Sequence, residues 1–149
     1  MFELTKRPID AAVLMGGLRN PSAGALVTFE GWVRNQNEGR DVLRLEYEAY
    51  AKLAENEGAK ILEAAAGRFD VIEVACVHRV GRLNVGEMAV WVGVTAVHRA
   101  DAFAACQHII DEVKHRVPIW KKEHYADGDT GWVHCHACDA PTLSRSEVP

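Results

Sequence analysis

Hydrophobic and polar positions alternate along residues 25–34 and again along residues 43–50. A period of two residues places successive side chains on opposite faces of a strand, so the alternation predicts two strands that each bury one face. The polar linker between them, Asn35 to Arg40, is predicted to be mobile. Residues 9–18, which follow Pro8, are predicted to form a helix before the first strand.

Two longer segments carry apolar residues at helical spacing. Between Ala51 and Phe69 the apolar residues fall on one side and the charged residues on the other, which is typical of a helix that covers a sheet. A second long helix is predicted to begin near Asp101 and to end before Pro118, because proline cannot continue a helix. The residues expected on its buried side are Phe103, Cys106, Ile110, Val113 and Val117.

The second half of the chain repeats the order of two strands and a helix. Strands are predicted at residues 71–80 and 88–97, separated by a turn at residues 81–86. The strand at 88–97 is almost continuously apolar, which predicts burial on both faces. A short strand is predicted at residues 132–134. The chain is therefore expected to fold as a two-layer α+β domain with a mixed, largely antiparallel sheet and two long helices.

The composition indicates one globular domain, predicted at residues 1–140 and followed by a flexible tail at 141–149. The chain has 149 residues, of which 48% are hydrophobic and 26% are charged. No apolar run approaches the roughly 18 residues that a membrane helix needs, and no export signal opens the chain, so we expect a cytoplasmic location. With 17 basic and 21 acidic residues, a general nucleic-acid binder is disfavoured.

The four cysteines do not form the pattern of a disulfide framework. Cys76 and Cys106 lie within apolar segments and are predicted to pack in the core. Cys135 and Cys138 have a Cys-x-x-Cys spacing with His134 and His136 beside them, so a small zinc-binding regulator is one alternative interpretation. A structural zinc site usually takes a second ligand pair from another segment, and the sequence offers none, so we expect no bound metal.

The segment from Lys114 to Glu123 holds three of the six lysines of a net-negative chain. Because Pro118 disfavours the helical conformation, Lys114 is expected in a last helical turn and Lys121 just after a bend. Two ammonium groups can then converge on an anion. The alternative is that Lys114 and its basic neighbours only complement the negative end of a helix dipole.

His98 and Arg99 end the predicted buried strand just before the second long helix begins. This position places side chains and free backbone N–H groups next to a possible phosphate. The alternative is that Arg99 extends into solvent while His98 caps the strand.

Arg79, in the predicted strand at residues 71–80, has a structural interpretation. It is predicted to form an ion pair with Glu73 on one face of that strand.

Five segments, in this order and at these spacings, resemble the large, catalytic subunit of molybdopterin synthase. The resemblance covers about Gly24 to Trp132. The segments are Gly31-Trp-Val-Arg-Asn35, Leu45-Glu-Tyr-Glu-Ala-Tyr50, His78-Arg-Val-Gly81, Gly93-Val-Thr-Ala-Val-His-Arg99 and the lysine segment.

The resemblance implies a fold of the α/β hammerhead type and a sulfurtransferase activity. The family converts cyclic pyranopterin monophosphate into the dithiolene molybdopterin, using sulfur from the C-terminal thiocarboxylate of a small ubiquitin-like subunit. It implies a homodimer within a heterotetramer that contains two such carriers. No cofactor of the chain's own is implied, and no cysteine has to be catalytic because the partner supplies the sulfur.

Matching the family's motifs residue by residue gives Lys114 and Lys121 as the catalytic residues. A lysine ammonium stabilises a developing oxyanion, and crowding between these two cations is expected to let them move protons near neutral pH. The matching residues for binding the anionic substrate are Arg34, His98 and Arg99. Further substrate-binding candidates are Lys122, Glu123, Val33 and Trp32, the last through its backbone because an indole cannot make a charge-assisted bond to phosphate.

Two questions stay open at this point. Glu123 is predicted either to orient Lys121 or to contact the substrate's ring nitrogens, and Trp120 either to pack or to border the pterin. A non-catalytic module that binds a ubiquitin-like protein or a phosphorylated metabolite is the alternative function, since a basic cluster can serve binding alone.

Overall fold

The computed structural model describes residues 1–134; the predicted tail at 141–149 and both Cys135 and Cys138 lie outside the described residues. The elements, in chain order, are β1 (Phe2–Thr5), α1 (Ala11–Gly17), β2 (Ala25–Trp32), β3 (Gln36–Asn37), β4 (Arg40–Ala49), α2 (Ala51–Arg68), β5 (Glu73–Arg79), β6 (Gly81–Asn84), β7 (Met88–Ala96), α3 (Arg99–Arg116), β8 (Ile119–Tyr125) and β9 (Thr130–His134). None of the helices described is long and apolar enough to cross a membrane.

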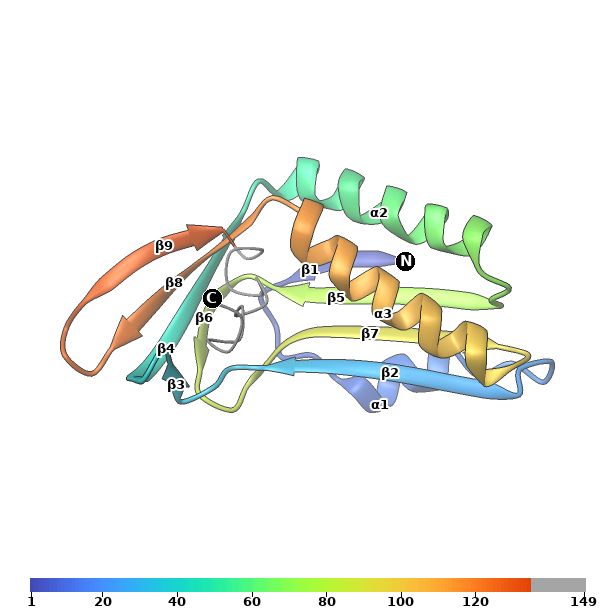
Figure 1. Ribbon diagram of the computed structural model, residues 1–149, viewed down its shortest axis with the longest axis horizontal. Coiled ribbons are helices and arrows are strands. Elements are labelled where there is room, and N and C mark those ends of the chain that lie inside the picture. The colour runs from blue at the N-terminus through green and yellow to red at the C-terminus, as the bar shows by residue number, and fades with distance from the viewer. Residues whose placement is uncertain (135–149) are drawn as a thin grey trace, which may run out of the picture.

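The strands divide between two sheets (Figure 1). The first has the order β1-β5-β7-β2, with β1 parallel to β5 and the other neighbours antiparallel. The second has the order β3-β4-β8-β9, and β6 also pairs with β4. The expected mixed, largely antiparallel pairing is confirmed.

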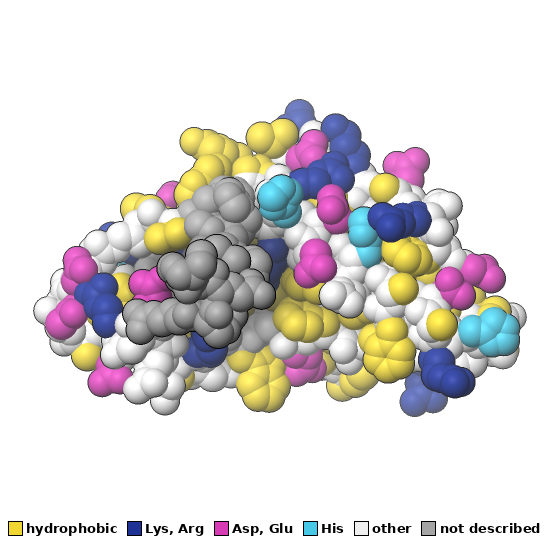
Figure 2. Space-filling view, viewed as in Figure 1, with side chains coloured by type: hydrophobic (Ala, Val, Ile, Leu, Met, Phe, Trp, Pro, Cys, Tyr) yellow, Lys and Arg dark blue, Asp and Glu magenta, His cyan; other side chains and the backbone are white. Residues whose placement is uncertain are grey.

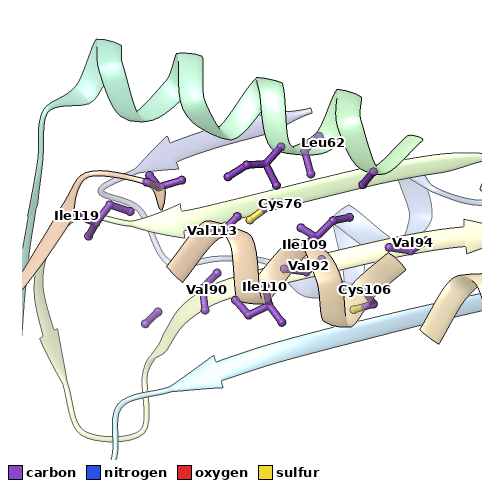
Figure 3. Packing of buried hydrophobic residues seen from close by; sticks show 14 of the residues in the cluster. Leu62, Cys76, Val90, Val92, Val94, Cys106, Ile109, Ile110, Val113 and Ile119 are labelled. Carbon is purple, nitrogen blue, oxygen red and sulfur yellow. The ribbon is translucent and has the colours of Figure 1, made fainter. Parts of the chain in front are cut away.

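The two long helices, α2 and α3, pack against the same face of the four-stranded sheet and against each other (Figure 1). Their apolar side chains meet those of β5 and β7 in the main core, which Figure 3 shows around Cys76, Val92 and Ile109. This arrangement is the expected two-layer α+β fold. On the opposite face, the short α1 and its cap Leu18 cover Trp91, which is fully buried.

The predicted buried stripe of α3 is wrong at one position. Phe103 is 61% exposed, whereas Cys106, Ile110, Val113 and Val117 are buried as expected. The spacing of the large apolar residues predicts Phe103 on the buried side, but the helix turns the smaller residues 102 and 105 towards the sheet instead. The buried side also contains Ala102, Ala105 and Ile109, and the two alanines allow close packing of the helix on the sheet.

Two segments predicted as a linker and a turn are strands. In the supposed mobile linker, Glu38 and Gly39 both have positive φ, so β3 and β4 are joined by a tight two-residue hairpin turn. Residues 81–84, within the predicted turn, form β6 and pair with β4. The sequence does not predict β1 or β8 either. The strands β1, β6 and β8 pair with strands distant in sequence, and β3 has only two residues, so local periodicity does not reveal them.

Arg79 does not pair with Glu73. Its Nη1 donates to Oε1 of Glu87 at 3.1 Å, and its Nη2 donates to the carbonyl of Lys6 at 3.2 Å. Glu73 begins β5 and Arg79 ends it, whereas Glu87 precedes β7 beside that end of the strand. The buried guanidinium therefore joins the β6–β7 turn to the end of β1.

Candidate active site

A cavity of about 360 Å³ lies where α3 ends and the two sheets meet. It brings together side chains from the end of β2, the segment after it, the β3–β4 hairpin, α3 and β8. The lining residues are Phe29, Gly31, Trp32, Arg34, Gln36, Asn37, Val42, Leu45, Tyr47, Lys114, Lys121 and Glu123. Three candidates from the sequence, Lys114, Lys121 and Arg34, therefore line one cavity.

The backbone around Pro118 explains how the two lysines reach the same cavity. Lys114 lies in the last turn of α3, the helix ends at Arg116, and its C-cap Val117 has an extended conformation with ψ of 128°. Proline imposes this conformation on the residue before it. The chain then enters β8, where Lys121 and Glu123 are two residues apart and project from the same face of the strand. The predicted placement of Lys114 before a bend and Lys121 after it is confirmed.

Lys121 forms an ion pair with Glu123 deep in the cavity. The distance from Nζ to Oε1 is 3.1 Å, and the side chains are 12% and 7% exposed. Glu123 also accepts hydrogen bonds at Oε2 from the Nδ2 of Asn37, at 2.7 Å, and from the hydroxyl of Tyr125. Burial favours the protonated form of Glu123, but these hydrogen bonds and the charge of Lys121 outweigh it and hold its pKa below the ordinary value.

This carboxylate changes the expected electrostatics of the lysines. The sequence predicts crowding between Lys114 and Lys121 and leaves the role of Glu123 open, whereas in the structure Glu123 forms an ion pair with Lys121. A carboxylate stabilises the ammonium form and opposes the effect of crowding by Lys114. Of the two predicted roles of Glu123, the contact with Lys121 is present.

The structure shows the surroundings of three other substrate-binding candidates. Trp32 lies at the cavity but is 63% exposed, with its indole N–H bonded to Glu30. The side chain of Val33 is buried, and its backbone bonds to the carbonyl of Glu87 and the N–H of Gly86. Lys122 lies on the opposite face of β8 from Lys121, with its Nζ 5.6 Å from the centroid of the Trp132 ring.

His98 and Arg99 are exposed at the other end of α3, where His98 is the N-cap and Arg99 the first helical residue. Fifteen residues of helix at 1.5 Å each separate Arg99 from Lys114, which is about 22 Å along the axis. A single chain therefore does not bring His98 and Arg99 to the lysine cavity.

A buried histidine, His78, contacts one of the residues that line the cavity. The sequence does not predict this contact. The ring of His78 packs edge-on against Tyr47, a lining residue, with their centroids 5.1 Å apart. Burial lowers the pKa of His78 to about 4, and the charge of Lys114 acts in the same direction, against a hydrogen bond to the carbonyl of Arg79. His78 is therefore neutral near pH 7, and the field of Lys114 reaches it.

The cysteines inside the described part of the chain lie in the core, as predicted. Burial raises the pKa of Cys76 to about 12 and that of Cys106 to about 11, so both thiols stay protonated. Among residues 1–133 there is no cluster of three or more His, Cys, Asp or Glu that could hold a metal ion. On the face drawn in Figure 2, basic and acidic side chains are interspersed.

Comparisons with known proteins agree on one family. The family model described as MoaE protein matches residues 4–116. A Thermoplasma volcanium protein named molybdopterin synthase catalytic subunit is 41% identical over 130 residues, which cover 87% of this chain and 95% of that protein. The solved structure of molybdopterin synthase from Staphylococcus aureus superposes with a TM-score of 0.83 at 36% identity, covering 89% of this chain and 96% of that one.

A more distant solved structure has the same fold. It is a Helicobacter pylori complex of subunits 1 and 2 of molybdopterin-converting factor, with a TM-score of 0.71 at 19% identity. The alignment covers 89% of this chain and 88% of that one.

Proposed function

The chain belongs to the MoaE protein family, the family of the molybdopterin synthase catalytic subunits, and we propose that it transfers sulfur from a carrier's C-terminal thiocarboxylate to cyclic pyranopterin monophosphate. The product is the dithiolene of molybdopterin, so the chain is an enzyme of molybdenum cofactor biosynthesis. The observation that carries the proposal is the convergence of Lys114, Lys121 and Arg34 on one cavity.

The chemistry requires positive charge and protons in the same place. The thiocarboxylate and the substrate phosphate are both anions, and each oxygen that leaves the pterin side chain has to be stabilised or protonated. Lys114 and Lys121 supply preorganised charge from two walls of the cavity. Arg34 keeps its charge throughout and is suited to binding the phosphate. Glu123 holds the ammonium of Lys121 in place.

A second copy of the chain can bring its His98 and Arg99 to the lysine cavity. Both residues are exposed and lie about 22 Å along α3 from Lys114. We infer a homodimer in which each chain offers the N-terminal end of α3 to the substrate phosphate at its partner's cavity. Two small ubiquitin-like carriers complete a heterotetramer. No cofactor of the chain's own takes part in this proposal.

The carrier's C-terminus has a candidate route to the lysines. A second hollow, of about 640 Å³, lies between β1, β4, β6 and the start of α2, and Tyr47 lines both this hollow and the lysine cavity. Gly81, which has no side chain, and Ala49 also line it. Because Tyr47 borders both hollows, we propose that the carrier's C-terminus reaches the lysines from this second hollow.

A turnover assay tests the proposal against the binding-module alternative. The purified chain is mixed with cyclic pyranopterin monophosphate and a carrier verified by mass analysis to be thiocarboxylated. We expect dithiolene formation. Complex formation without any turnover would favour a module that only binds the carrier.

Replacing Arg34 by alanine should chiefly weaken substrate binding. A phosphate contact present in both ground and transition states changes affinity more than the chemical step. We expect the Kd for the pterin to rise roughly tenfold or more, because a hydrogen bond to a charged group is lost. Titration calorimetry and single-turnover kinetics measure the two effects. Arg19→Ala, at an exposed arginine after α1, is the matched control.

The Arg34 prediction fails if the single-turnover rate at saturating pterin falls strongly while the Kd stays unchanged. That result would place the guanidinium in the chemical step.

Replacing all four cysteines should leave carrier-dependent dithiolene formation largely intact. Cys76 and Cys106 are buried and protonated, so alanine or serine is chosen at each to limit the loss of packing, and Cys135 and Cys138 become serine. The sulfur comes from the carrier in this mechanism. A persulfide on any of the four during turnover, together with inactivity of the folded variant, would show that the chain carries its own sulfur.

A further inference from the structure

The two carboxylate oxygens of Glu123 have different partners. Oε1 faces the Nζ of Lys121 at 3.1 Å. Oε2 accepts hydrogen bonds from the side-chain amide of Asn37 and from the hydroxyl of Tyr125, and these two donors also contact each other at 3.2 Å. The contact with Lys121 therefore depends on a carboxylate whose other oxygen is already fixed.

The two donors come from separate parts of the fold. Asn37 ends β3, and the turn at residues 38–39 fixes its position opposite Arg40 of β4. Tyr125 ends β8 and projects from the same face as Glu123, two residues earlier. Arg40 stacks on the Tyr125 ring, with its Cζ 3.7 Å from the centroid. The β3–β4 hairpin thus meets the end of β8 at this carboxylate.

Arg40 is itself held from the turn between β8 and β9. Its Nη2 lies 2.8 Å from Oδ2 of Asp127 and 2.9 Å from Oδ2 of Asp129. The aromatic ring of Tyr125 is therefore fixed on one side by an anchored guanidinium, which leaves its hydroxyl directed at Glu123.

We propose that Asn37 and Tyr125 are positioning residues that fix the carboxylate of Glu123 and, through it, the ammonium of Lys121 at the reaction centre. This inference rests on the proposed function. Neither residue has to touch the substrate for this role. A loss of either hydrogen bond frees the carboxylate to rotate, and a catalytic group displaced by about 1 Å can cost two orders of magnitude in rate.

The same hydrogen bonds set the ionisation of Glu123. Burial raises the pKa of this carboxyl, while the bonds from Tyr125 and Asn37 and the charge of Lys121 lower it further than burial raises it. The other cations that line the cavity are Lys114 from α3 and Arg34 from the segment after β2. Removing one donor leaves burial less opposed, so the pKa of Glu123 has to rise and the acid limb of the rate profile has to move to higher pH.

The test compares Tyr125→Phe and Asn37→Ala with Tyr50→Phe in the full chain. Tyr50→Phe removes the same hydroxyl from a ring that is 67% exposed and lies outside the cavity. The single-turnover rate is measured at saturating pterin with thiocarboxylated carrier, and the Glu123 carboxyl is titrated by carbon-13 NMR without substrate.

We expect the rate to fall about tenfold or more in both test variants, with the Kd for the pterin changed less than about threefold. The Glu123 titration should move to higher pH in both, and Tyr50→Phe should match the wild type. Unchanged rates, or an unchanged Glu123 titration, in folded variants would overturn the positioning role. A wild type without turnover would instead refute the proposed function, and the carboxyl titration alone would then decide whether the two residues hold Glu123.

Discussion

Replacing Lys121 by methionine is expected to lower the single-turnover rate of dithiolene formation about a hundredfold or more, because a preorganised charge at the reaction centre is lost. Methionine keeps an apolar stem in a position that is only 12% exposed. Glu123 loses its ion pair but keeps its bonds to Asn37 and Tyr125, so the fold and the carrier complex should persist. Circular dichroism and gel filtration with the carrier check both.

Lys60→Met is the control for Lys121→Met. Lys60 lies on α2, outside the cavity, and its side chain is 66% exposed. We expect this variant to keep a rate within about threefold of wild type. A Lys121→Met rate within that same range would contradict a catalytic role, since losing such a donor usually costs far more.

Replacing Lys114 by alanine is expected to lower the rate to a similar extent and to let a singly sulfurated pterin accumulate. Lys114 reaches the cavity from α3, whereas Lys121 reaches it from β8, so the two ammonium groups act on the substrate from different sides. Mass analysis of the pterin trapped during turnover reveals the intermediate.

An NMR titration of His78 checks, without substrate, that Lys114 lies where the structure places it. Burial is the main reason that the pKa of His78 falls to about 4, and the charge of Lys114 lowers it further. The pKa of His78 should therefore rise in Lys114→Ala. Full activity in that variant, with no singly sulfurated species, would remove Lys114 from the chemistry.

The sequence predicted those features that depend on local pattern. Pro118 alone required a bend between Lys114 and Lys121, and the structure places both at one cavity. The long apolar run of β7 predicted burial on both faces, which is confirmed. The family resemblance then pointed to Arg34, which lines the same cavity.

What the sequence did not predict depends on contacts between distant residues. Asn37 is 86 positions from Glu123, and nothing in a polar linker indicates that its amide reaches a buried carboxylate. The strand that Arg79 shares with Glu73 predicts an ion pair between them, but the turn before β7 brings Glu87 to Arg79 instead. His98 and Arg99 lay next to an expected anion site, and only the length of α3 shows that they are far from Lys114.

Isotope labelling tests the transfer of sulfur most directly. The purified chain is mixed with cyclic pyranopterin monophosphate and a carrier whose thiocarboxylate contains sulfur-34, and the pterin product is analysed by mass spectrometry. We predict a dithiolene in which both sulfur atoms are sulfur-34. A dithiolene that contains sulfur-32, or no dithiolene at all with a carrier verified to be fully thiocarboxylated, would contradict sulfur transfer from the carrier at the lysine cavity.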